Sequence, residues 1–197
     1  MRPRRADVLR AARDLIDNEG LDGLTIAALA AAMGVPPDGL PYPSRQALLE
    51  GVADELLSAL AEPPPAGPWD QRLITLAHRL RRALLSLRDG PRLVAEAAVT
   101  DPETMHAART GMQILADAGL PPDRAAWTVL AVIQFVVGHT IEEQAPRDDT
   151  PAKLAATTGD DAAVELGAAL TADPGRRFEF GLALIVDGIR RLFQSPA

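Results

Sequence analysis

Apolar residues recur at spacings of three and four along almost the whole chain, and no run of four or more alternates apolar with polar positions. A period near 3.6 indicates amphipathic helices, whereas half-buried strands alternate with a period of two. The pattern therefore predicts an all-α protein. The expected helices are one ending at Gly20, then 25–33, a single turn at 37–40, 44–60, 69–88, 91–99, 102–118, 122–144, 160–170 and 175–194.

Local signals divide the first sixty residues. Thr25 is a good N-cap for the short helix that ends before Gly34, and Ser44 caps the helix that follows. Ala30 lies four residues before Gly34. A tight turn between two crossed helices needs a small residue at their contact and a glycine at the reversal. The spacing favours a helix-turn-helix over an ordinary alanine-rich hairpin.

Proline-rich and polar stretches indicate the domain organisation. We expect a helix-turn-helix domain over 1–60, a stiff linker at 61–68 ("AEPPPAGP") and a larger helical domain over 69–197. The segment 144–161 is polar and rich in helix breakers, so we expect a disordered loop there.

Composition and charge narrow the class of protein. The net charge of −7 argues against a surface that coats nucleic acid, although a local basic patch remains open. The chain contains no cysteine, which excludes disulfides and thiolate metal sites. The uncharged run 125–141 is short for a membrane span and contains Gln134 and His139. We expect a core helix of a soluble, cytoplasmic protein without a membrane partner.

Motifs for catalysis are missing from the sequence. The three histidines, His78, His106 and His139, lie about 30 residues apart without metal-ligand spacing, and a solvated or hydrogen-bonded role suits each better. The acidic "GDD" at 159–161 is better explained as a solvated turn than as a cation site. We expect no enzyme, no cofactor and no metal.

A series of short motifs surrounds the predicted helix-turn-helix. Residues 5–57 combine AA-x-x-L-I-x-x-x-G, the L-T-I helix entry, the L-A-x-x-x-G-V turn and P-S-R-x-A-L-L. This stretch resembles the DNA-binding domain of the tetracycline repressor (TetR) family. The segments "ALLSLRDGPRL", "GHTIEEQ" and "FEFGLALIVDGIRRLF" resemble the ligand-binding and dimerisation domain of the same family, in the same order.

The resemblance implies a helical homodimer that binds double-stranded operator DNA and senses a small molecule. Ligand binding would move the fourth helix and spread the two DNA-reading heads. The DNA-binding positions that it implies, together with the N-terminal arginines, are Arg2, Arg4, Arg5, Thr25, Pro36, Pro37, Asp38, Tyr42, Ser44 and Arg45.

Two residues are missing from the stretch where the family continues its recognition helix. Pro41 disfavours helical geometry at Leu40, so we expect a recognition helix of about one turn. Pro36 and Pro37 donate no hydrogen bonds, and Asp38 can only accept one and would repel phosphates. Tyr42 could instead anchor the fourth helix. Residues 1–60 hold six arginines against nine carboxylates, a net charge of −3.

The ligand site implied by the resemblance is mostly apolar. By alignment, its positions are Ala61, Leu76, Leu80, Val94, Ala97, Ala98 and Glu142. Val94 stands where tetracycline-binding members have a metal-binding histidine, so a hard-cation site is not expected. The pocket should prefer an apolar, metal-free ligand. Glu142 could hold a cationic or hydroxyl-bearing group, or simply face solvent beside Glu143.

Two functions remain open from the sequence. The turn motif, Thr25 and the basic arm favour a ligand-responsive transcriptional regulator, and specifically a repressor. The shortened recognition helix and the acidic head favour a TetR-like small-molecule binding protein that has lost sequence-specific DNA binding.

Overall fold

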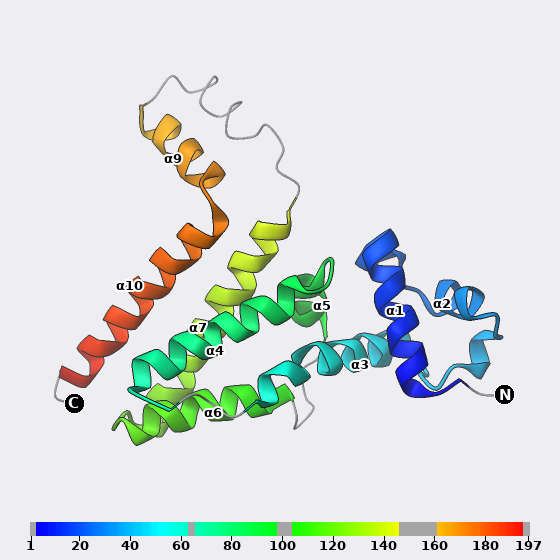
Figure 1. Ribbon diagram of the computed structural model, residues 1–197, viewed down its shortest axis with the longest axis horizontal. Coiled ribbons are helices and arrows are strands. Elements are labelled where there is room, and N and C mark those ends of the chain that lie inside the picture. The colour runs from blue at the N-terminus through cyan, green and yellow to red at the C-terminus, as the bar shows by residue number, and fades with distance from the viewer. Residues whose placement is uncertain (1–2, 63–65, 98–103, 146–160, 195–197) are drawn as a thin grey trace. The chain divides into compact units, whose positions relative to one another are not determined.

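The computed structural model describes residues 3–62, 66–97, 104–145 and 161–194, and the regular elements in these ranges are helices (Figure 1). The predicted all-α class is confirmed. Most of the loop predicted at 144–161 lies outside the described residues.

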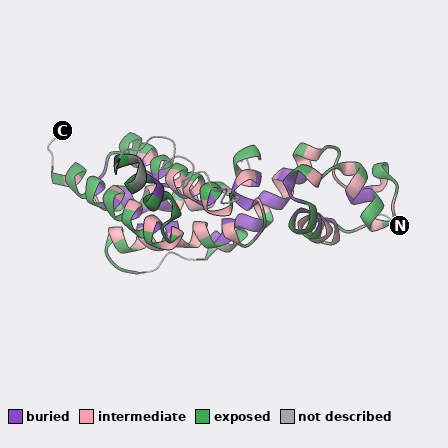
Figure 2. Ribbon diagram, turned by 90° about the horizontal axis from the view of Figure 1, so that it is seen from above, coloured by how far each residue is buried: buried purple, intermediate pink, exposed green. Residues whose placement is uncertain are grey.

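Three α-helices form the N-terminal part: α1 (Arg5–Glu19), α2 (Ile26–Met33) and α3 (Arg45–Leu57). A 3-10 turn, η1 (Leu21–Gly23), joins the first two, and a second, η2 (Pro37–Gly39), precedes α3. Helix α1 packs on α2 and α3, and each of these helices has buried residues (Figure 2). Their fully buried side chains include Val8, Ala12, Ile16, Leu21, Leu24, Leu29, Leu48, Leu49 and Val52.

The 3-10 turn η3 (Ser58–Ala61) follows α3, and the next helices are α4 (Trp69–Leu85), α5 (Gly90–Glu96), α6 (Thr104–Asp117) and α7 (Pro122–Gln144). Helix α5 packs on α3 and α4, and α6 packs on α4. Helices α6 and α7 approach closely at Gly111, where a β carbon would lie 3.1 Å from Cγ2 of Val129.

Several helix ends differ from the sequence prediction, and the helix expected over 91–99 ends at Glu96. The helix expected over 44–60 becomes 3-10 after Leu57. The helix expected over 69–88 ends at Leu85, because the Ser86 N–H bonds the Ala83 carbonyl at 3.2 Å and the chain then turns. Asp89 closes that turn with a φ of 55°, in the left-handed region that L-residues seldom adopt.

The chain divides into two compact units, Met1–Ile141 and Glu142–Ala197. The second contains the end of α7, then α9 (Asp161–Thr171) and α10 (Pro174–Gln194). The linker predicted at 61–68 lies within the first unit, so the predicted domain boundaries stay a prediction.

Among the described residues, α7 is long and apolar enough to cross a membrane by length and composition alone. A core helix passes the same test, and a third of its most apolar window is buried inside the structure. The composition of α7 therefore does not distinguish a membrane-spanning helix from a core helix.

Candidate functional site: a helix-turn-helix and an apolar pocket

The turn between α2 and η2 has the geometry that the sequence predicts. The Thr25 hydroxyl oxygen accepts a hydrogen bond from the Ala28 N–H at 3.0 Å and caps α2. Gly34 ends the helix with a φ of 65°, and the N–H of Val35 bonds the Ala30 carbonyl at 3.0 Å. A β carbon at Gly34 would meet nothing within 4 Å, so its backbone conformation, and not crowding, requires glycine.

The recognition segment is a single 3-10 turn, as expected. Leu40 has a φ of −72° and a ψ of 145°, which confirms that Pro41 keeps it out of helical geometry. The exposed residues of the segment are Pro36, Pro37 and Asp38. None of these three side chains donates a hydrogen bond, so this surface can offer bases only the Asp38 carboxylate as an acceptor.

Tyr42 lies against α3. A β carbon built on Gly51 would lie 2.9 Å from both Cε1 and the hydroxyl oxygen of Tyr42, and 3.2 Å from Cδ2 of Leu9. Burial raises the pKa of the Tyr42 phenol, and the charge of Arg5, 5.8 Å above the ring centre, partly opposes this rise. The ring therefore packs against α3 and supports its position, independently of any contact with DNA.

The N-terminal basic arm is exposed where it is described. Arg4 donates to the Asp7 carboxylate at 2.9 Å, which lowers the pKa of Asp7, and the Arg4 side chain is 85% exposed. Arg5 lies over Tyr42. Arg2 lies outside the described residues.

The N-terminus of α3 combines a cap with an inward-turned arginine. The Ser44 hydroxyl oxygen accepts from the Ala47 N–H at 3.1 Å. Arg45, which we expected at a phosphate, donates to the carbonyls of Leu24 at 2.9 Å and Leu21 at 3.2 Å. These bonds tie α3 to the α1–α2 connection. A phosphate contact by Arg45 stays a prediction, and it would compete with them.

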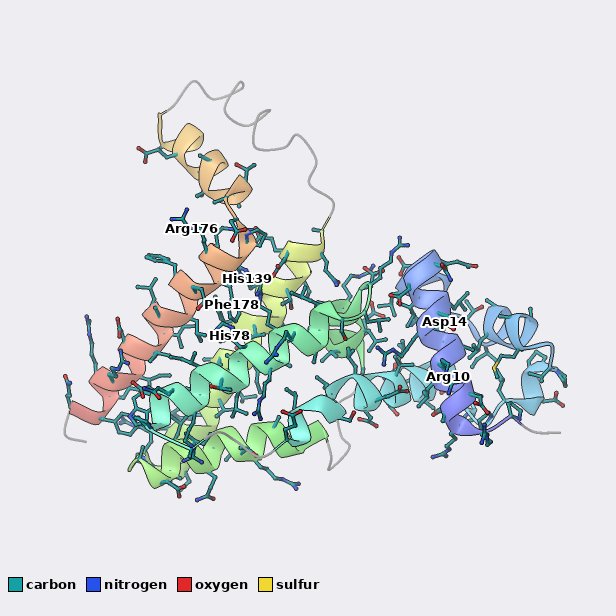
Figure 3. All side chains as sticks on the ribbon, viewed as in Figure 1. Arg10, Asp14, His78, His139, Arg176 and Phe178 are labelled. Carbon is teal, nitrogen blue, oxygen red and sulfur yellow. The ribbon has the colours of Figure 1, made fainter. Side chains whose placement is uncertain are left out.

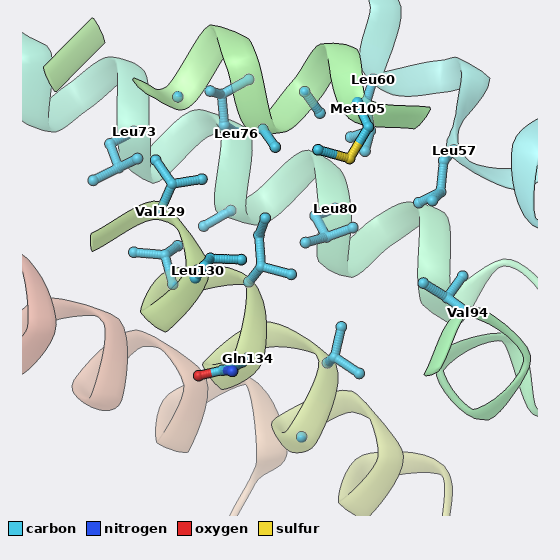
Figure 4. Close-up of a pocket in the computed structure, with 18 of the residues that line it drawn as sticks. Leu57, Leu60, Leu73, Leu76, Leu80, Val94, Met105, Val129, Leu130 and Gln134 are labelled. Atoms are coloured by element: carbon cyan, nitrogen blue, oxygen red, sulfur yellow. The ribbon is translucent and has the colours of Figure 1, made fainter. Parts of the chain in front are cut away.

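An apolar pocket of about 580 Å³ lies among α3, α4, α5, α6 and α7 (Figure 4). Its volume falls in the range of about 300–1,000 Å³ that is typical of small-molecule sites. Among the described lining residues, Gln134 is the one whose side chain carries nitrogen or oxygen. The larger lining side chains are Leu57, Leu60, Leu73, Leu76, Leu80, Val94, Met105, Val129, Leu130, Ile133, Gln134, Val137 and Ile141.

Some of the predicted ligand-binding residues line the pocket and others do not. Leu76, Leu80 and Val94 line the pocket. Ala97 is buried at the end of α5 but does not belong to the lining. Glu142 belongs to the second unit, where its carboxylate pairs with Arg177 at 2.8 Å. The side chain of Ala61 and all of Ala98 lie outside the description.

Sequence reasoning did not find the pocket walls that α6 and α7 supply. Met105 and Gly111 come from α6, and Val129, Ile133 and Val137 come from α7. The uncharged run 125–141 was the available signal, but it predicts only a core helix and not which cavity that helix lines.

Two of the three histidines have described side chains, and that of His106 lies outside the description. His78 lies on α4 and His139 on α7 (Figure 3), and the His139 ring stacks obliquely on Phe135 with centres 5.8 Å apart. In the described part of the chain, no three His, Asp or Glu side chains form a group that could hold a metal ion.

The turn between α4 and α5 holds the end of α1. The Arg88 N–H donates to the Asp17 carboxylate at 2.9 Å, and the Arg88 guanidinium reaches the Asn18 carbonyl at 3.1 Å. The Asp89 carboxylate accepts from the Leu21 N–H at 2.9 Å. The positive Arg88 side chain thus lies at the partly negative C-terminal carbonyls of α1. The negative Asp89 side chain lies at the partly positive first N–H of η1, so both contacts are electrostatically favourable.

Helix α5 adds further contacts to this junction between the α4–α5 turn and the helix-turn-helix. Arg92 pairs with Asp22 at 3.1 Å, and Glu96 pairs with Arg45 at 3.6 Å. Val94, between them in the sequence, lines the apolar pocket. One short helix therefore contacts both the pocket and the helix-turn-helix.

Comparisons with known proteins agree with this arrangement. A family model described as "Tetracyclin repressor-like, C-terminal domain" matches residues 62–193. The class A tetracycline repressor from transposon 1721 of Escherichia coli is 33% identical, over 93% of this chain and 89% of that protein.

Two solved structures from Streptomyces coelicolor share the fold. A possible TetR family transcriptional regulator has a TM-score of 0.86 and 34% identity, over 96% of this chain and 100% of that one. The TetR family protein ActR in complex with (S)-DNPA has a TM-score of 0.83 and 26% identity, over 97% and 98% of the two chains. The chain belongs to the TetR family of transcriptional regulators.

Proposed function

We propose that this protein is a ligand-responsive repressor that binds operator DNA as a homodimer and is released by a small, mostly apolar, metal-free effector. The observation that carries the proposal is the position of α3. Its first turn follows the recognition segment, and its last residue, Leu57, lines the pocket. A ligand that displaces Leu57 acts directly on the helix that supports the DNA-reading surface.

The pocket chemistry defines the effector class. A ligand in this pocket meets aliphatic side chains and one amide, that of Gln134. Burying a charged ligand there would be costly, because an ionised group without a partner is destabilised by several kcal/mol. We infer an uncharged organic effector with at most a few hydrogen-bonding groups, bound without a metal or cofactor.

Exposed apolar stripes on two helices support the homodimer. Trp127, Leu130 and Ile141 are exposed on α7, and Phe180 and Leu184 are exposed on α10, at 68% and 59%. Each helix also has an interior glycine, Gly138 or Gly188, where a β carbon would meet nothing within 4 Å. Interior glycine costs a helix about 0.5–1 kcal/mol relative to alanine. Close approach of a second copy would explain why Gly188 is tolerated, whereas Gly138 lies on the wall of the apolar pocket.

We also propose a cytoplasmic location, in which a partner subunit covers these stripes. Helix α7 buries Val129, Val132 and Val136 on one side and exposes Trp127 and Leu130 on another. A helix that serves a core and a partner is apolar on both faces, so its membrane-like composition does not require a membrane.

DNA affinity in this proposal comes mainly from backbone contacts. The N-terminal arm with Arg2, Arg4 and Arg5, and the helix N-termini at Thr25 and Ser44, would meet phosphates. Pro36, Pro37 and Asp38 offer little to base edges, so specificity should be modest.

One observation favours a second function. The recognition segment is a single 3-10 turn without side-chain donors, on a head of net charge −3. A protein with this surface could bind its small molecule and no specific DNA.

DNA binding in about 50 mM salt separates the two functions, because phosphate contacts are strongest at low salt. We expect the purified protein to bind the DNA upstream of its own gene. The double substitution Arg4→Ala and Arg5→Ala should weaken binding to all sequences alike and flatten the salt dependence by about two units of slope. No binding at this salt concentration would leave the small-molecule binding function in its place.

A further inference from the structure

A second cleft, separate from the apolar pocket, lies where α1, α3 and α4 meet. Its volume is about 340 Å³, and none of its lining residues belongs to the apolar pocket. The lining residues are Arg13, Glu55, Leu56, Glu62, Arg79, Arg82, Ala83 and Ser86. The two clefts therefore differ in chemistry as well as in place.

Three guanidinium groups and two carboxylates face this cleft, which gives it a net positive charge in a chain of net charge −7. Leu56 and Ala83 are buried beneath it, at 4% and 7% exposure. A positively charged cleft with an apolar floor suits an organic anion better than a free inorganic ion.

The two ion pairs in the cleft are loose. Arg13 lies 3.4 Å from Glu55, and Arg79 lies 3.6 Å from Glu62, whose side chain is 71% exposed. Charge-assisted hydrogen bonds between such groups are usually about 2.7–2.9 Å long. The two carboxylates are 40% and 71% exposed, so each can turn to solvent when a ligand oxyanion replaces it, while Arg79 keeps its hydrogen bond to the Glu62 carbonyl at 3.0 Å.

Arg82 has no such partner. It is exposed on α4, and no hydrogen bond or ion pair joins it to the described part of the chain. Ser86, one turn later, donates its hydroxyl hydrogen to the Ala83 carbonyl at 2.8 Å. Its lone pairs thus remain for a ligand hydroxyl, while Arg82 offers its guanidinium donors to an oxyanion.

We infer that this cleft binds a small organic anion that carries phosphate or carboxylate groups, with Arg82 as its main charge partner. Arg13 and Arg79 bind the remaining anionic oxygens from α1 and α4. The bound anion therefore links a helix of the helix-turn-helix to a helix of the pocket domain. The binding site itself does not depend on whether the protein binds DNA.

Isothermal titration calorimetry of the full-length protein without DNA tests the inference at low ionic strength. Inorganic phosphate and citrate are titrated separately, so that the two anion classes are distinguished. We expect citrate to saturate a single site per chain and inorganic phosphate to bind more weakly, and saturation by phosphate alone would contradict an organic ligand. Arg82→Ala should weaken that binding about tenfold or more, since a guanidinium contact to an oxyanion is lost. Glu62→Gln should tighten it, because a competing carboxylate is removed.

Arg124→Ala is the matched control, because it removes an exposed arginine of α7 that lies outside the cleft. This variant should bind like the unmodified protein. Arg82→Gln, which keeps a polar side chain, provides a second test if the alanine variant does not fold. The inference is overturned if neither anion saturates by about 10 mM. It is equally overturned if the Arg82 variants bind as tightly as Arg124→Ala.

Discussion

The Asp89 carboxylate accepts a hydrogen bond from the backbone N–H of Leu21, 2.9 Å away, although the two residues are 68 positions apart in the sequence. Leu21 is fully buried, so its N–H has little access to water as a replacement partner. This bond joins the α4–α5 turn to the helix-turn-helix.

Replacing Asp89 tests the strength of that bond. Asp89→Gly keeps the left-handed backbone but removes the acceptor, and it should lower the free energy of unfolding by about 1–3 kcal/mol. Asp89→Asn keeps an acceptor oxygen and also tolerates this conformation, so its loss should be smaller. Urea denaturation measures both. Equal losses would mean that the hydrogen bond contributes nothing.

Gly51 should resist substitution because of Tyr42. A β carbon there would lie 2.9 Å from the tyrosine ring, so Gly51→Ala forces the ring or α3 to move. We expect a loss of about 1–3 kcal/mol in the free energy of unfolding, as for other overpacked cores. In a Tyr42→Ala background the same substitution should become neutral or stabilising, since the obstacle is gone. A double-mutant cycle that shows no coupling would contradict this packing.

Tyr42 is the only tyrosine in the chain, which makes its titration directly visible in the ultraviolet absorbance of the phenolate. Burial raises the pKa of Tyr42 above its ordinary value of 10.0, and the nearby charge of Arg5 opposes that rise. Arg5→Ala should therefore raise the pKa further. Because the folded state holds the phenol proton more tightly than the unfolded state, stability should fall as pH rises above 10.0. A pKa at or below that value in the native protein would exclude this environment for the ring.

Gly188 should behave in the opposite way from Gly51 if α10 forms a dimer interface. Nothing within 4 Å would meet a β carbon at Gly188, so Gly188→Ala should favour the isolated helix by about 0.5–1 kcal/mol. In a close helix contact between two copies, the added methyl group should instead weaken association. Leu184→Asp should weaken it more strongly. Sedimentation equilibrium measures both, and Arg176→Asp in the first turn of α10 is the control.

The apolar pocket should exclude magnesium–tetracycline. By alignment, Val94 stands where tetracycline-binding members have a metal-binding histidine, and Val94 and Leu76 both line the apolar pocket. Calorimetry with tetracycline and Mg²⁺ should show no sub-micromolar binding. Tight binding that depends on magnesium would show that the alignment is wrong.

A charge inside the pocket should abolish its affinity for apolar molecules. Leu80→Asp places a carboxylate among aliphatic side chains, where an unpaired charge is costly. It should remove binding of the fluorescent probe N-phenyl-1-naphthylamine. Leu166→Asp, at an exposed position of α9, should not change probe binding.

Local signals in the sequence predicted much of the fold. Thr25 and Ser44 cap helices where expected, and Gly34 ends α2 in the left-handed conformation. The shortened recognition segment was also predictable, because proline restricts its own backbone and that of the preceding residue. Each of these effects involves only a few neighbouring residues, so the sequence shows it directly.

The junction and the pocket walls were not predictable in the same way. Asp17 and Arg88 are 71 positions apart, and no periodicity relates them. The direction of Arg45 depends on the carbonyls of Leu21 and Leu24, and the sequence alone does not show that these lie near its side chain. Apolar periodicity identifies the faces of α6 and α7 but not which helix or cavity each face meets.

The prolines around the recognition segment have a consequence for how it meets any partner. Pro36, Pro37, Pro41 and Pro43 each fix one backbone torsion, and Pro36 already has a φ of −68° in the free protein. Ordering a flexible segment costs about 1–2 kcal/mol of conformational entropy for each residue. This segment has lost most of that freedom before binding. It would therefore enter a complex as a preformed shape, at a smaller entropic cost than a flexible segment.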